Sequence, residues 1–133
     1  MRYSTILAPV VAAAALLAGC GGGDTGSSGV TLVSIAGEDL ETISGNRCAM
    51  KGNATNTGNA RARVRLRYEA KNAAGDVIGE STADFEVAGF SNFEFTFNKG
   101  NSSGQPSSSP FTNNLACGGI QRFDRVDTDI DTL

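Results

Sequence analysis

The chain has 133 residues, with 11 basic residues, 14 acidic residues and no histidine, and its formal net charge at pH 7 is −3. A mildly acidic chain lacks the basic surface that nucleic-acid phosphates require, so we expect no nucleic-acid partner. The absence of histidine excludes Ser/His/Asp and Cys/His nucleophilic sites and removes the most common general base and metal ligand, so we expect no enzymatic activity, no metal site and no cofactor.

Residues 1–19 have the layout of a secretory signal peptide. A positive start at Arg2 is followed by an apolar run that is too short for a permanent membrane helix and that ends in Leu17-Ala18-Gly19-Cys20. This ending resembles the lipobox of bacterial lipoproteins, in which the cysteine is lipidated and becomes the first residue of the mature protein. The alternatives are an ordinary secretory signal with a chance cysteine, and a buried helix.

The lipobox resemblance implies a protein of the bacterial cell envelope, held at the membrane by acyl chains on Cys20. The residue after the cysteine is Gly21 rather than aspartate. In Gram-negative bacteria this resembles the default signal for export to the outer membrane, where the protein would face the periplasm. Residues 20–29 are rich in glycine and serine and predict a flexible tether behind the lipid. Residues 30–133 are enough for one domain with a modest core.

From Val30 onward the apolar residues alternate with polar ones, which is typical of strands with one buried face. Residues 40–43 are too short a segment to assign. Residues 98–109 are rich in glycine, serine and asparagine and predict a loop long enough to be mobile. One or two closing strands are predicted between residues 111 and 130. We expect six to eight strands and therefore an all-β, antiparallel sandwich. The other predicted strands cover residues 30–35, 48–55, 61–70, 77–78, 84–87 and 93–98.

A known family shares several of these turns and strands. The stretch Gly52-Asn53-Ala54-Thr55-Asn56-Thr57-Gly58, the alternating strand Val64–Tyr68 and the turn and strand Asn72–Gly79 resemble the FxLYD-type domain. The match covers about residues 46–98 and departs from the family at Asn72, which usually is aspartate, and at Lys71, which usually is tyrosine. The resemblance implies an immunoglobulin-like β-sandwich of secreted and lipid-anchored bacterial proteins, and its motif residues shape turns rather than carry chemistry.

Two cysteines, Cys48 and Cys117, remain if Cys20 carries lipid. Outside the cytoplasm such a pair predicts a disulfide, which would close a loop of roughly 70 residues and contribute about 4 kcal/mol by the chain-entropy model. The alternatives are a metal pair and two buried free thiols. Two cysteines without histidine make a poor zinc site.

Four arginines at a spacing of two residues are the most distinctive surface feature. They would project from one face of a strand in a row roughly 20 Å long, which we call the arginine row. As a functional site, the row would bind an anionic partner such as lipid headgroups, a phosphorylated glycan or an acidic protein. As a structural feature, which we favour, it would pair with carboxylates at Asp84, Glu86 or Glu94 on neighbouring strands. The arginine row consists of Arg61, Arg63, Arg65 and Arg67.

The acidic segment Asp127–Asp131 has oxygens at alternate positions, as in the start of a calcium loop. It lacks the glycine bend and the closing glutamate of an EF-hand. Alternation alone would also place its three aspartates on the solvent side of a closing strand, so the two interpretations stay open.

These features together predict a lipid-anchored envelope protein whose small β-sandwich acts as a protein-interaction or structural module. Its partners would be the membrane, through the N-terminal lipid, and another envelope protein. The alternative function is binding of an anionic lipid or glycan through the arginine row.

Overall fold

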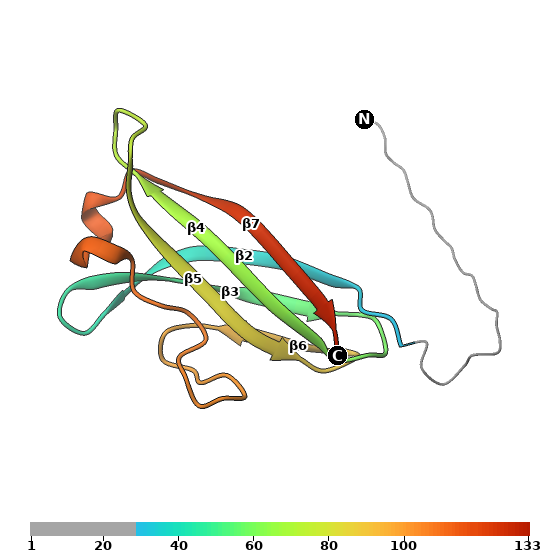
Figure 1. Ribbon diagram of the computed structural model, residues 1–133. Coiled ribbons are helices and arrows are strands. Elements are labelled where there is room, and N and C mark those ends of the chain that lie inside the picture. Colours follow the sequence, from blue (N-terminus) through green and yellow to red (C-terminus); the bar gives the residue numbers. More distant parts are fainter. Residues whose placement is uncertain (1–28) are drawn as a thin grey trace, which may run out of the picture.

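Strands dominate the part of the chain that the computed structural model describes, residues 29–133 (Figure 1). The predicted signal peptide, Cys20 and the tether up to Ser28 lie outside the described residues. No helix among residues 29–133 is long and apolar enough to cross a membrane. The elements are β2 (Val33–Ile43), β3 (Arg47–Asn56), β4 (Ala62–Lys71), β5 (Val77–Val87), β6 (Ser91–Phe95), the 3₁₀ turns η3 (Thr112–Asn114) and η4 (Cys117–Gly119), and β7 (Arg122–Thr132).

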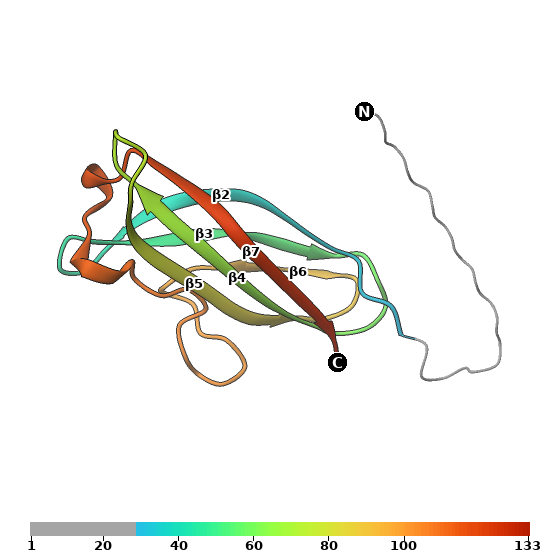
Figure 2. The same cartoon turned by 45° about the horizontal axis from the view of Figure 1, so that its top comes forward.

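The strands form two antiparallel, three-stranded sheets in the orders β2-β3-β6 and β5-β4-β7. The two sheets lie as layers over each other (Figures 1 and 2). The hairpins β2-β3 and β4-β5 each stay within one sheet, whereas the chain crosses between sheets before β4, β6 and β7. This is the order of strands A-B-E and C′-C-F in immunoglobulin-like sandwiches. The predicted all-β sandwich is therefore confirmed.

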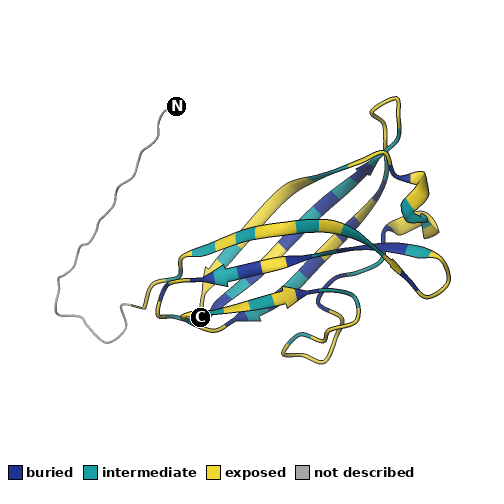
Figure 3. Cartoon of the chain, turned by 180° about the vertical axis from the view of Figure 1, so that it is seen from behind, coloured by how far each residue is buried: buried dark blue, intermediate teal, exposed yellow. Residues whose placement is uncertain are grey.

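The alternating sequence of β4 explains why it occupies the centre of its sheet. Its inward side chains, at positions 62, 64, 66, 68 and 70, are at most 2% exposed, and those between them reach solvent. The same banding of buried and exposed positions runs along the facing strands (Figure 3). Aromatic rings fill the space between the layers, where Phe85 stacks on Phe93 and Phe95 at centroid distances of 5.0 and 5.1 Å. This apolar layer is the core.

The strand boundaries correct the sequence prediction in β2 and β5. Residues 40–43 belong to β2, which pairs with β3 along its length except at a bulge between Ala36 and Asp39. Gly37 adopts a φ of 65° there, and the extra residue changes the phase of the alternation, so the pattern looks like two short pieces. β5 is one continuous strand. The sequence prediction divided it because its buried face includes the small residues Gly79 and Ser81, which carry no hydrophobic signal.

A further prediction, the strand over residues 93–98, is corrected. β6 ends at Phe95, because the backbone N–H of Thr96 donates to Ser107 Oγ (3.0 Å) rather than to a strand. Phe97 therefore lies beyond the strand, with the Arg47 guanidinium 5.7 Å from its ring centroid. β7 is the single closing strand in the described part of the chain, and the segment before it forms the turns η3 and η4.

The loop at residues 98–109 is irregular, as predicted, but its second half is bonded to the sandwich. Ser107 and Ser108 are fully buried, and Ser108 Oγ donates to the carbonyl of Met50 (2.6 Å). The N–H groups of Asp84 and Ser109 form backbone hydrogen bonds that join the loop to β5 at 3.0 and 2.9 Å. This half of the loop therefore covers the outer edge of β5.

Gly52 on β3 leaves room for the ring of Phe95, its cross-strand partner on β6. A Cβ atom at this position would lie 2.6 Å from the Phe95 ring, which is shorter than any tolerable contact. We expect Gly52→Ala to lower the free energy of unfolding by about 1–3 kcal/mol, because the ring must leave its position in the core. Denaturant titration measures this loss. Gly118→Ala is the matched control, since a Cβ there meets nothing within 4 Å; equal stabilities of the two variants would contradict the expectation.

Candidate functional site

The arginine row lies on the outer face of the β5-β4-β7 sheet, at its middle strand. Because β4 has a neighbour on both sides, carboxylates from β5 and β7 flank Arg63 and Arg65. Arg63 forms a two-pronged bond to Asp84 (Nε–Oδ1 3.1 Å and Nη2–Oδ2 3.0 Å), and Arg65 bridges to Asp129 (3.0 Å) and Asp131 (3.5 Å). The sheet thus brings the predicted residues together with acidic partners already in place.

The two arginines at the ends of the row are paired more loosely. Arg61 lies 3.5 Å from Glu86, and Arg67 lies 3.6 Å from Glu69 and 3.7 Å from Glu80. Glu94, which we considered as a partner, sits on β6 in the other sheet and takes no part. Four guanidinium groups therefore face six carboxylates.

This charge balance determines what the face can do chemically. The row is neutralised by its own sheet, and an incoming anion would have to displace a carboxylate from each arginine. The hydrogen bond and charge of Asp84 raise the pKa of the Arg63 guanidinium, so the pair favours its ionised form. The geometry corresponds to the structural interpretation, in which cross-strand ion pairs hold the register of the sheet.

The acidic segment on β7 is part of the same arrangement. Asp129 and Asp131 both contact Arg65, and Asp127 stands opposite Arg67 in the strand register. The alternation predicted for a closing strand accounts for all three positions. Within residues 29–133, no group of three or more acidic or cysteine side chains is arranged to hold a metal ion.

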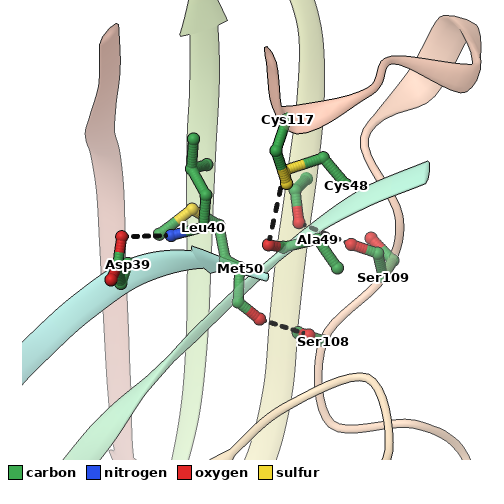
Figure 4. Close-up of a disulfide and its surroundings, with 9 residues drawn as sticks. Asp39, Leu40, Cys48, Ala49, Met50, Ser108, Ser109 and Cys117 are labelled. Carbon is green, nitrogen blue, oxygen red and sulfur yellow. Dashed lines mark hydrogen bonds between the residues drawn. A yellow bond between two sulfur atoms is a disulfide. The ribbon is translucent and has the colours of Figure 1, made fainter. Parts of the chain in front are cut away.

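A disulfide joins Cys48 and Cys117, with an S–S distance of 2.02 Å (Figure 4). Cys48 is fully buried on β3, while Cys117 begins η4 just before β7, so the bond ties one sheet to the strand that closes the other. Backbone bonds of 2.8 Å from Cys48 N–H to Leu115 and from Phe111 N–H to Cys48 hold the same segment against β3. The disulfide predicted from the cysteine count is present, and the metal pair and the free thiols are excluded.

A polar cluster that the sequence did not reveal closes the side of the sandwich between β2 and β7. Tyr68 donates its hydroxyl hydrogen to Glu38 Oε2 (2.7 Å), and Arg125 Nε donates to the same oxygen (2.8 Å). Arg125 also donates to Thr128 Oγ1 (2.6 Å). We call Glu38, Tyr68 and Arg125 the edge cluster.

The edge cluster exists because both edge strands carry a bulge. The bulge at Gly37 turns Glu38 toward the interior, and a register shift in β7 places Arg125 opposite the inward-facing Tyr68. Burial, and then the hydrogen bond to Glu38, raise the pKa of Tyr68 far above its ordinary value of about 10. A glycine inside an alternating segment was the one available sequence signal for this feature.

No protein-family model matches the chain, and no curated protein or solved structure is significantly similar to it. The fold and the contacts above define the class directly: residues 29–133 form an all-β sandwich with a disulfide from β3 to the turn η4 and an ion-paired outer face.

Reversing the charges of Arg63 and Arg65 tests the role of the arginine row. We expect Arg63→Glu/Arg65→Glu to fold with a melting temperature lowered by a few degrees, because like charges then face each other across three strands. The charge-exchanged variant Arg63→Asp/Asp84→Arg is the control. It keeps an ion pair at these two positions, so its melting temperature should lie much closer to that of the wild type. A normal melt combined with lost binding to anionic vesicles or glycans would instead support the anion-binding alternative.

The edge cluster predicts a pH dependence of stability. Since the folded-state pKa of Tyr68 lies above the unfolded value, its contribution is complete below about pH 10 and falls as the pH rises further, by at most about 1.4 kcal/mol per pH unit. We expect Tyr68→Phe to be less stable than wild type at about pH 8, with a difference that shrinks toward about pH 11. Urea titrations at both pH values measure it. A difference that is the same at both would show that the hydroxyl ionises freely in the folded protein.

Proposed function

We propose that this chain is a lipid-anchored protein of the bacterial envelope and that its β-sandwich serves as a protein-interaction or structural module. One observation carries the anchor: of three cysteines, the disulfide uses Cys48 and Cys117, so Cys20 is the cysteine left over. That residue ends the lipobox-like stretch Leu17-Ala18-Gly19-Cys20. A structural disulfide also fits a compartment outside the cytoplasm, where the lipid would be attached.

The resemblance to FxLYD-type domains supports the role of a module. Asn56, in the first motif, is buried and organises a turn: its Oδ1 accepts from the N–H groups of Leu32 (3.2 Å) and Gly58 (3.0 Å). Asn72, where the family usually has aspartate, accepts from Ala74 and Asp76 with the same kind of oxygen, at 3.0 Å each. The motif residues thus act on the backbone, which suits a binding scaffold rather than a reaction site.

The proposed role is non-catalytic and relies on a sheet edge or face. The loop at residues 98–109 covers the outer edge of β5, whereas β2 and β7, each 11 residues long, have one edge that no other described strand covers. A partner protein can add backbone hydrogen bonds at such an edge. The ion pairs between the arginine row and its flanking carboxylates favour this role over the alternative, binding of an anionic lipid or glycan.

Replacing the predicted lipidated cysteine tests the anchor. We expect Cys20→Ser to lose incorporation of a radioactive fatty acid and to keep its signal peptide, because the acceptor thiol is gone. Cys48→Ala/Cys117→Ala is the matched control and should still be labelled, since it lacks the disulfide but keeps Cys20. Undiminished label in Cys20→Ser would end the proposal.

A further inference from the structure

Most of the strongly exposed large apolar side chains in the described chain gather at one end of the sandwich. Four of the six flank the turn at residues 57–61, to which they are joined by backbone hydrogen bonds of 2.9–3.0 Å. This is the end near the label C in Figure 1, and we call it the apolar end. Its members are Val30, Leu32, Phe90 and Leu133, which are 50%, 59%, 75% and 59% exposed.

Phe90 is the residue at the apolar end that the fold explains least. It lies in the turn between β5 and β6, is 75% exposed, and adopts a φ of 55°, in the region that favours glycine. A bulky side chain at such an angle is strained, and an exposed phenyl ring gains nothing from the core. Glycine would suit this position better for the sandwich alone, so the ring points to a function beyond folding.

The chain enters the sandwich at the same end. Nine residues separate Cys20 from Val30, and at full extension they reach about 30 Å. β2 continues away from this end for 11 residues, a length of about 36 Å. A bilayer that holds Cys20 is therefore within reach of the apolar end. The turn at residues 72–76 lies at the opposite end, and the tether is too short to run along the sandwich and bring that end to the same bilayer.

We propose that the apolar end is a membrane-contact surface, at which Phe90, with Val30 and Leu32 beside it, enters the interfacial layer of the bilayer that holds the lipid on Cys20. The inference rests on the proposed lipid anchor and adds the orientation of the domain to it. The acyl chains keep the bilayer close, so a small apolar contact is enough to orient the sandwich. The disulfide and η3 then face away from the membrane.

The absence of tryptophan in the sequence allows a direct test. Phe90→Trp places a single tryptophan at the apolar end, and Val77→Trp places one at the opposite end, where Val77 is 49% exposed. Each lipidated protein is reconstituted in phosphatidylethanolamine–phosphatidylglycerol vesicles with brominated acyl chains, which quench tryptophan only at membrane depth. We expect several-fold stronger quenching of Phe90→Trp than of Val77→Trp, with both variants melting like the wild type.

Flotation of the vesicles separates this inference from the proposed function. If the protein floats with the vesicles but both variants are quenched equally, the anchor stands and the membrane-contact surface is wrong. The emission of Phe90→Trp could instead shift to the blue as the protein concentration rises, with no quenching by the brominated lipids. The apolar end would then join two copies of the chain, which also overturns the inference. If the protein carries no lipid and does not float, the proposed lipid anchor is wrong, and the membrane-contact surface that rests on it is overturned as well.

Discussion

The alternation of side chains along β4 is the constraint on which the rest of the domain depends. Its inward residues, with Tyr68 the largest, form one wall of the core, and its outward residues include Arg63, Arg65 and Arg67 of the arginine row. A one-residue slip of β4 would turn its arginines into the core and its core residues to solvent, and would misalign its pairing with both β5 and β7. The bonds of Arg63 to Asp84 and of Arg65 to Asp129 act on the same register from the outer face.

The bulges in the edge strands β2 and β7 close the open side between the two layers. A regular β2 would direct Glu38 to solvent, and the bulge at Gly37 turns it inward instead, toward Tyr68 and Arg125. A buried tyrosine hydroxyl needs a hydrogen-bond partner, and the carboxylate of the edge cluster provides one that Arg125 also neutralises.

The disulfide and the proposed anchor act at opposite ends of the molecule. Cys117 holds the segment before β7 to β3 near the turns η3 and η4, whereas the chain enters the sandwich at the apolar end. With the proposed membrane contact at the apolar end, the domain would present its sheet edges to a partner in one orientation. This arrangement is compatible with the proposed protein-interaction module.

The sequence by itself determined the features that depend on local pattern or on counting: the period of β4, the pairing of Cys48 with Cys117, and the turns at Asn56 and Asn72. It could not determine which carboxylates meet the arginine row, because Asp84 and Asp129 reach it through the register of strands far apart in the chain. The continuity of β2 was hidden because a bulge changes the phase of the alternation. Only the tertiary structure decided the edge cluster, since whether Glu38 faces solvent or Tyr68 depends on how the two sheets pack.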